Sequence, residues 1–374
     1  MAEVKFLGKM PNPFVKEDGT MVSKEEWKTY KYELLEKIVD IEYGGMPPKP
    51  EIVEIERLSM PSRGIVPNCF RIHAGKKEKK LTFILEIYVP IPKGKSKYSP
   101  LAEGEKYPVL LTGDGCWQNM NSQVIEEAMK RGYITAKFNR LEVANDVRGS
   151  QEGGIYDIYP NMDFTDISAW AWPYMVCMDV FEKLSFTDEK EVGITGHSRG
   201  GKVVMLAAAV DERIKYVCIN NSGCHGAASH RCVVTNQGEM KKEAERISDM
   251  FKNFPTWMGK KLEAYVDNEQ NLPYDMHYFG AMIAPRFYLQ NEGMQDYWGN
   301  PISAWQNFMA VKKCYEYLGC ENNLGAWFRP GGHHHQFSAF TTFLDFMDRA
   351  RNGLGVAEHL KINPYPEIEK NFDW

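Results

Sequence analysis

The sequence predicts an α/β fold, in which helices cover both faces of a mostly parallel central sheet. Three observations predict it. The chain has 374 residues, which is enough to bury one large core. Its composition, 43% hydrophobic and 25% charged, is typical of a globular protein. From residue 81 onward, short apolar runs alternate with helical patterns, which favours parallel strands joined by right-handed crossovers.

Each expected element follows from a local pattern. Apolar side chains at helical spacing, from Trp27 to Ile41, predict an amphipathic helix over residues 25–41. Apolar runs bounded by turn residues predict strands over residues 81–89, 107–111, 133–138, 191–195, 214–220, 286–290 and 325–328. Periodic segments between them predict helices over residues 124–130, 167–184, 202–209, 303–318 and 337–349, and a helical insertion over 240–251. We expect one domain over residues 1–374, with an N-terminal extension over 1–75 and a possible lid insertion over 225–275.

The segment Gly196-His197-Ser198-Arg199-Gly200 follows one of these strands and precedes a helix of small residues. A strand, a sharp turn with serine at its apex and a helix form the G-x-S-x-G nucleophile elbow. Glycine is needed on either side of the serine because the strand and helix backbones nearly touch there. With the alternating elements, the elbow predicts an α/β-hydrolase fold, whose active site lies at the carboxyl ends of the strands.

A serine nucleophile needs a histidine base and an acid that orients the histidine. In this fold both follow the serine in the chain, on loops after late strands. Asp296 follows the strand that ends at residue 290 and is the preferred acid, with Glu292 as the reserve. His333, His334 and His335 follow the last strand, and one of them is expected to be the base.

The negative charge that develops on the substrate oxygen during acyl transfer needs fixed hydrogen-bond donors. The backbone N–H of Arg199, the residue after the serine, is expected to be one donor, and the loop over residues 112–117 is expected to supply another. The guanidinium of Arg199 adds positive charge. Helix N-termini disfavour cations, so this arginine indicates a role beyond helix stability.

No metal or other cofactor is expected. Three consecutive histidines resemble a metal-binding run, but neighbours on a loop do not readily face one ion, and neither an HExxH motif nor paired carboxylates accompany them. The eight cysteines lack the close CxxC pairs of a zinc site, and we interpret them as reduced residues that lie mostly in the core.

The net charge of −5 gives no reason to expect nucleic acid or an anionic membrane as a partner. The sequence contains neither a signal-peptide core at its N-terminus nor a long apolar stretch, so we expect a cytoplasmic protein. Its partner is expected to be a small-molecule or oligosaccharide ester, and the sequence does not predict an oligomeric state.

The run Ser198-Arg199-Gly200-Gly201-Lys202 is similar to the S-R-x-G-K signature of carbohydrate esterase family 15, the glucuronoyl esterases, and of related bacterial esterases. The resemblance extends over most of the chain, through segments at residues 43–47, 138–142, 167–172, 272–277 and 283–286. It implies hydrolysis of the ester between a glucuronic acid branch of xylan and a lignin alcohol.

The resemblance also implies roles for single residues. Ser198 matches the nucleophile, and Arg199 matches the arginine that stabilises the oxyanion. Lys202 matches the lysine that hydrogen-bonds the uronate sugar, and Trp298 matches its aromatic neighbour. A sugar ring is expected to stack on Trp298 or on Trp117.

In many family members the catalytic histidine precedes a cysteine that is bonded to a cysteine just before the serine. Those cysteine positions correspond here to Gln336 and His197, which implies His335 as the base and removes the disulfide. Many members also carry their acid in an E-S-G sequence, where this chain has Asn221. An amide cannot replace an ionised carboxylate beside imidazolium, so Asp296 is expected to supply the acid.

The sequence thus predicts a serine carboxylesterase with Ser198, Asp296 and His335 as its triad, most consistent with a glucuronoyl ester as substrate. The alternatives are an acetyl xylan or feruloyl-type esterase, and a catalytically inactive binding protein with a hydrolase fold.

Overall fold

The elements come from a computed structural model, which describes residues 2–102, 104–241 and 243–374. The strands are β1 (Glu3–Phe6), β2 (Ile52–Arg57), β3 (Asn68–Gly75), β4 (Lys80–Tyr88), β5 (Tyr107–Thr112), β6 (Ile134–Phe138), β7 (Thr187–His197), β8 (Tyr216–Asn220), β9 (Cys232–Thr235), β10 (Phe287–Gly293) and β11 (Leu324–Arg329). The α-helices are α1 (Lys24–Tyr43), α2 (Ser122–Lys130), α3 (Gly154–Ile158), α4 (Asp166–Lys183), α5 (Arg199–Val210), α6 (Ile247–Asn253), α7 (His277–Ile283), α8 (Pro301–Leu318) and α9 (Phe337–Arg351).

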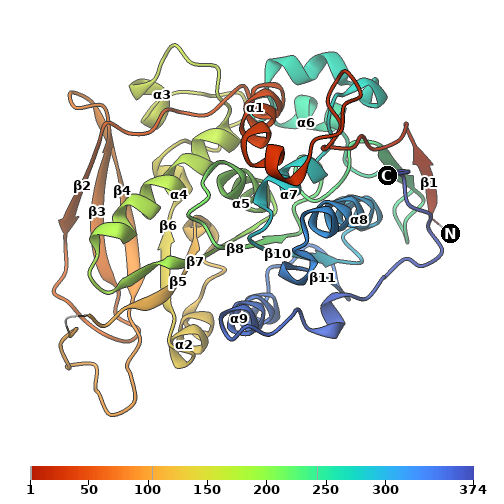
Figure 1. The fold of residues 1–374 in the computed structure, drawn as a ribbon. Coiled ribbons are helices and arrows are strands. Elements are labelled where there is room, and N and C mark those ends of the chain that lie inside the picture. The colour runs from red at the N-terminus through yellow and green to blue at the C-terminus, as the bar shows by residue number, and fades with distance from the viewer. Residues whose placement is uncertain (1, 103, 242) are drawn as a thin grey trace.

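A nine-stranded sheet of order β11-β10-β8-β7-β5-β6-β4-β3-β2 runs through the molecule, with helices on both faces (Figure 1). The strands from β6 to β11 in this order are parallel. The strands β2, β3 and β4 form an antiparallel edge, and β4 joins the parallel part by antiparallel pairing with β6. This arrangement confirms the predicted α/β-hydrolase fold. Because the carboxyl ends of parallel strands meet at one edge of a sheet, the loops after β7, β8, β10 and β11 converge.

The predicted strands and helices are present with their ends shifted by a few residues, and three differences matter. Strand β10 continues to Gly293, so Glu292 lies in the strand and not on the loop after it. The insertion predicted as helical over residues 240–251 becomes helical only at Ile247, and its residue 242 lies outside the described part of the chain. Strands β2 and β3 were not predicted. The edge strand β2 is partly exposed along its length, and β3 alternates buried with half-buried side chains, so polar residues interrupt the apolar signal in both.

Helix α4 and the elbow helix α5 form the centre of the main core. Nearly every side chain of both helices is buried, and α5 packs against α4 and α7 as well as against β7 and β8. Small residues in α5 allow these close contacts, which hold the first turn of the helix rigidly at the elbow. None of the helices in the described ranges is long and apolar enough to cross a bilayer.

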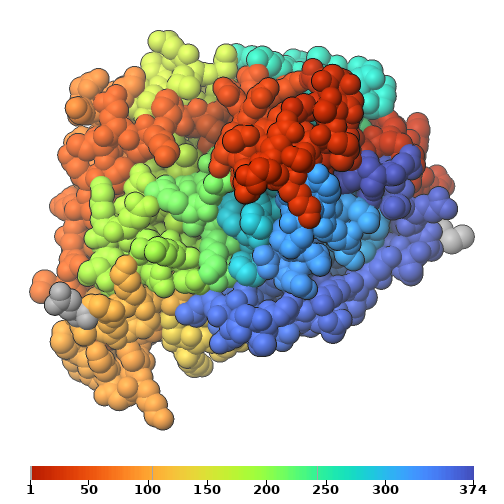
Figure 2. Space-filling model, in the orientation of Figure 1, coloured from red at the N-terminus to blue at the C-terminus, as the bar shows by residue number. Residues whose placement is uncertain are grey.

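The two ends of the chain lie side by side on one flank (Figures 1 and 2). The side chain of Asn371 donates to the carbonyl of Gly8 across 2.8 Å, and the indole N–H of Trp374 donates to the carbonyl of Met10 across 2.9 Å. Strand β1 pairs with β9, which belongs to the segment predicted as a lid insertion. The N-terminal extension is thereby tied both to the C-terminus and to this insertion, whose role as a lid stays a prediction.

All eight cysteines are unpaired in the described residues, and five of them are buried. The burial of most of them agrees with the expectation that the cysteines lie mostly in the core. The cellular location stays a prediction.

Candidate active site

Ser198 lies at the apex of a sharp turn between β7 and α5, as the elbow pattern predicts. Its backbone has φ 56° and ψ −122°, a conformation that non-glycine residues rarely adopt. A Cβ atom on Gly196 would lie 2.2 Å from the carbonyl oxygen of Gly200, so only glycine allows strand and helix to approach this closely. The backbone N–H of Ser198 donates to the carbonyl of Asn220, which ties the turn to the end of β8.

A buried ion pair between Asp114 and Arg140 stabilises the elbow. Asp114 accepts a hydrogen bond from the backbone N–H of His197 across 2.8 Å and forms a close ion pair with Arg140. A Cβ atom on Gly200 would meet the same Asp114 carboxylate at 2.3 Å. The guanidinium of Arg140 lies 4.2 Å from the ring centre of Trp117 and 5.3 Å from that of Trp170. The loop after β5 and the elbow are thus locked together through one carboxylate.

The guanidinium of Arg199 is fixed beside the nucleophile. Its Nη1 donates to Oδ2 of Asp146 across 2.6 Å, and its carbon lies 4.5 Å from the ring centre of Trp257. Its Nε–H is buried and has no hydrogen-bond partner in the described residues. The backbone N–H of Arg199 belongs to the first turn of α5, where N–H groups lack intrahelical acceptors. The backbone N–H of Arg199 is therefore placed to donate to a substrate oxygen, and the guanidinium adds positive charge beside it.

The predicted acid meets a histidine, and that histidine is His333. Its Nδ1 lies 2.7 Å from Oδ2 of Asp296, and the same carboxylate oxygen accepts from Nδ2 of Asn221 across 2.8 Å. Burial raises the pKa of Asp296, but the hydrogen bond and charge of His333 and the bond from Asn221 outweigh it and lower the pKa overall. Asp296 is 7% exposed and His333 is 46% exposed, so the pair joins a buried acid to an accessible imidazole.

His335, the base implied by the family resemblance, has no recorded contact with a carboxylate in the described part of the chain. Its ring stacks on Phe340 at 4.1 Å and lies 5.6 Å from the ring of His197. Burial, together with the nearby charge of Arg329, lowers the pKa of His335 to about 3. The expected contact of His335 with Asp296 is wrong, because the ring of His335 stacks on Phe340 and His333 takes its place beside Asp296. Which histidine acts as the base stays a prediction.

The loop that carries the three histidines is held by its backbone. The carbonyl of His334 accepts from Nδ2 of Asn220 across 3.0 Å and from the guanidinium of Arg329. The ring of His333 lies 4.5 Å from that of His197, the residue just before the nucleophile. The His333 imidazole thus extends from its carboxylate toward the elbow.

Glu292, the reserve acid, lies in β10, and its side chain is buried. Burial raises its pKa well above the usual range, the neighbouring charge of Asp296 raises it further, and the cations Arg329 and Lys202 only partly oppose this. Its Oε1 has no hydrogen-bond partner in the described residues. A buried carboxyl group that resists ionisation holds an imidazolium less well than Asp296, whose pKa is lowered.

Lys202 lies one turn into α5, and its ammonium group contacts other groups of the protein. Its Nζ donates to the carbonyl of Ser222 across 2.6 Å and to that of Cys224, and lies 3.6 Å from Oε2 of Glu245. Its side chain is only 4% exposed. The described contacts therefore make Lys202 a brace for the loop after β8, and its role in substrate binding stays a prediction.

The two predicted tryptophans lie on separate loops of the same edge. Trp117 is half-buried, with its ring centre 5.9 Å from that of His197 and 5.7 Å from the Arg199 guanidinium. Trp298 is half-buried too, and its carbonyl accepts from the backbone N–H of Glu245, the partner of Lys202. Trp117 thus lies near Arg199, and Trp298 is connected to Lys202 through Glu245.

Sequence patterns did not identify Asp146, Trp257, Glu245 or Arg329 as parts of this site. The first three lie in irregular segments without periodicity or motif. Arg329 ends β11, and its Nη2 donates to Oδ1 of Asn221 across 2.9 Å. A charged residue at the end of a late strand was the one sequence feature that could have placed Arg329 in the site.

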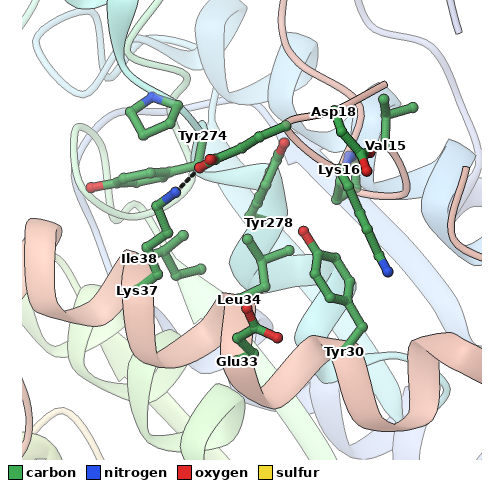
Figure 3. A pocket seen from close by; sticks show the side chains of 13 residues that line it. Val15, Lys16, Asp18, Tyr30, Glu33, Leu34, Lys37, Ile38, Tyr274 and Tyr278 are labelled. Atoms are coloured by element: carbon green, nitrogen blue, oxygen red, sulfur yellow. Dashed lines mark hydrogen bonds and ion pairs between the residues drawn. The ribbon is translucent and has the colours of Figure 1, made fainter. Parts of the chain in front are cut away.

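A pocket of about 450 Å³ lies elsewhere, between the N-terminal arm and α1 (Figure 3). Tyr30, Tyr274 and Tyr278 form part of its wall, and an ion pair between Lys37 and Glu17 crosses its rim. No residue predicted for catalysis or substrate binding lines it. The candidate active site is therefore the loop edge around Ser198, not this cavity.

The chain is similar to known esterases in sequence. A family model described as "Glucuronyl esterase, fungi" matches residues 72–319. The 4-O-methyl-glucuronoyl methylesterase 1 of Wolfiporia cocos is 26% identical over 336 residues, covering 87% of this chain and 76% of the relative. Carbohydrate esterase MZ0003, from an unknown prokaryotic organism, is 25% identical and covers 92% and 90%.

The chain is similar to solved structures as well. A carbohydrate esterase family 15 glucuronoyl esterase from Caldicellulosiruptor kristjansonii superposes with a TM-score of 0.81 and 27% identity, covering 97% of this chain and 96% of that one. The glucuronoyl esterase catalytic domain of Hypocrea jecorina superposes with a TM-score of 0.75 over 96% and 93%, at 22% identity, and supports the fold.

Proposed function

Because the chain belongs to the glucuronyl esterase family, we propose that it is a serine carboxylesterase that hydrolyses a glucuronoyl ester. The single observation that carries this proposal is the hydrogen bond of 2.7 Å between Asp296 and His333, an acid–base pair at the same loop edge as the nucleophile elbow. The name of the relative from Wolfiporia cocos, a 4-O-methyl-glucuronoyl methylesterase, favours a glucuronoyl ester over an acetate.

In the proposed reaction the His333 imidazole takes the proton of the Ser198 hydroxyl as its oxygen attacks the ester carbonyl. Asp296 holds the ring through Nδ1, which leaves Nε2 for the serine and stabilises the imidazolium as it forms. The backbone N–H of Arg199 donates to the oxyanion, and its guanidinium adds positive charge nearby. His333 then protonates the leaving alcohol, and water hydrolyses the acyl-enzyme through the same base.

The charge around Ser198 supports a strongly polar sugar as the acyl group. Arg199 lies beside Ser198 and near the half-buried ring of Trp117, and Lys202 lies one turn further along α5. Indole faces stack on sugar rings while cations orient their oxygens. A small acetyl group would use neither feature.

Hydrolysis of methyl glucuronate and of 4-nitrophenyl acetate by the wild type and by Ser198→Ala tests the proposal. We expect methyl glucuronate to be the better substrate, and we expect Ser198→Ala to lower its kcat by about 10³-fold or more. Faster hydrolysis of 4-nitrophenyl acetate, or of acetylated xylo-oligosaccharides, would instead assign an acetyl esterase. A folded wild type that is inert toward all three substrates would indicate a binding protein.

A further inference from the structure

A second cluster of reactive side chains is buried away from the nucleophile, where the loop after β8 meets the C-terminal end of α1. It contains Cys224, His225 and His230, and we call it the Cys-His-His cluster. The carboxylate of Glu42 lies against it from the last turn of α1. The side chains of Glu42, His225 and His230 are 0% exposed, and Cys224 is 3% exposed.

Glu42 orients both imidazole rings. Its Oε1 lies 2.5 Å from Nδ1 of His225 and 3.3 Å from Nε2 of His230. The hydroxyl of Tyr274 donates to the other carboxylate oxygen, so the carboxylate is itself held in place. Since one nitrogen of each ring faces Glu42, the second nitrogens, Nε2 of His225 and Nδ1 of His230, are left for another partner.

Those second nitrogens and the thiol of Cys224 share one small space. Nδ1 of His230 lies 3.8 Å from Sγ of Cys224. Nε2 of His225 is fully buried and has no hydrogen-bond partner in the described residues. One donor atom from each of Cys224, His225 and His230 lies within 4.8 Å of the other two.

We propose that the Cys-His-His cluster binds a single zinc ion through Sγ of Cys224, Nε2 of His225 and Nδ1 of His230. With Zn–S near 2.3 Å and Zn–N near 2.0–2.1 Å, the ligands of a tetrahedral site are roughly 3.3–3.6 Å apart, so modest ring movements close the site. Thiolate and imidazole are ligands that zinc prefers. A carboxylate on the far nitrogen of each ligating imidazole is the usual outer partner at zinc sites, and Glu42 has this position for both rings.

The ion would fix one loop of the chain, because Cys224, His225 and His230 all lie between β8 and β9. Glu42 connects this loop to α1 through both imidazole rings. The backbone carbonyl of Cys224 is also one of the acceptors that hold Lys202. Zinc in this cluster would therefore stabilise the loop that holds Lys202. Tyr274 separates it from the pocket of Figure 3, whose wall it also forms.

The metal content of the full-length protein tests this inference independently of esterase activity. Protein purified from zinc-supplemented cells is expected to contain about one zinc per chain by elemental mass spectrometry. We expect Cys224→Ser and His230→Gln to reduce the content to background. Cys218→Ser, which removes another buried thiol, and Ser198→Ala, which disables the proposed nucleophile, are expected to retain it.

Refolding of the metal-free wild type with Co²⁺ provides a second readout that needs no variant. Binding at the cluster is expected to produce a thiolate-to-cobalt absorption band and the strong visible bands of tetrahedral cobalt. A wild type that is isolated without zinc and takes up neither zinc nor cobalt on refolding overturns the proposal. So does a zinc content that Cys224→Ser and His230→Gln leave unchanged.

Discussion

Nδ2 of Asn221 lies 2.8 Å from Oδ2 of Asp296, so an amide at the end of β8 donates a hydrogen bond to the carboxylate that follows β10. The other end of the amide accepts from Arg329 across 2.9 Å. The E-S-G sequence of many glucuronoyl esterases has a glutamate at the position of Asn221. In this chain a second carboxylate there would repel Asp296, whereas the amide stabilises its ionised form.

Asn221→Asp is expected to raise the pKa of Asp296. Two carboxylates about 3 Å apart cannot both be ionised easily, so the ionised form of Asp296 is lost at a higher pH than in the wild type. We expect the midpoint of the Asp296 carboxyl titration, followed by NMR, to move up by about one pH unit. Asn221→Ala, which removes the donor without adding a charge, should move it less. Equal midpoints for the wild type and Asn221→Asp would contradict this assignment.

Asp296→Asn is expected to lower kcat by about 10³–10⁴-fold, because an amide no longer stabilises the imidazolium or holds the productive tautomer. The matched control is Glu292→Gln, which neutralises the reserve acid in β10 and is expected to retain most of the activity. Initial rates on methyl glucuronate measure both. The reverse pattern, with Glu292→Gln inactive, would show that the acid is on the strand.

His333→Ala is expected to abolish turnover, with kcat lowered by about 10³-fold or more, because it removes the imidazole that Asp296 orients. His335→Phe is the matched control, since its ring already stacks on Phe340 at 4.1 Å and a phenyl group can occupy the same place. We expect this variant to stay within about tenfold of the wild type. A loss of activity confined to His335→Phe would restore the base that the family resemblance implied.

Glu292→Gln is expected to stabilise the protein increasingly as the pH rises. The folded-state pKa of Glu292 is raised above the unfolded value of 4.5, so its protonated form contributes fully only below that value. As the pH increases toward the folded pKa, the unfolded state gains by ionising this carboxyl and the wild type loses stability. Thermal unfolding at pH 4, 6 and 8 should show a growing advantage of the variant. A constant difference would mean that Glu292 is ionised in the fold.

Gly196→Ala is expected to destabilise the fold by about 1–3 kcal/mol or more, because its Cβ would lie 2.2 Å from the carbonyl oxygen of Gly200 and neither backbone can move freely. Gly355→Ala is the control, since the nearest atom to its Cβ would be 3.9 Å away. Urea unfolding of the two variants measures the difference. Similar midpoints would show that the elbow relaxes more easily than its packing indicates.

The sequence by itself determined the α/β-hydrolase fold and the position of Ser198 at the apex of the elbow. Both depend on local patterns: alternating apolar runs set the order of strands and helices, and Gly196 and Gly200 permit the sharp turn around Ser198. The chain order of the predicted acid and base follows from the parallel sheet, which is why Asp296 and the three histidines were expected on loops after late strands.

Only the tertiary structure decided which histidine meets Asp296. Consecutive residues on a loop point in different directions, and contacts far along the chain choose among them: Asn220 and Arg329 hold the carbonyl of His334, and Phe340 stacks on His335. The same holds for Asp146 and Trp257 at Arg199, and for Glu42 at the Cys-His-His cluster. Such contacts join segments that have no local pattern in common, because they depend on how the whole chain packs.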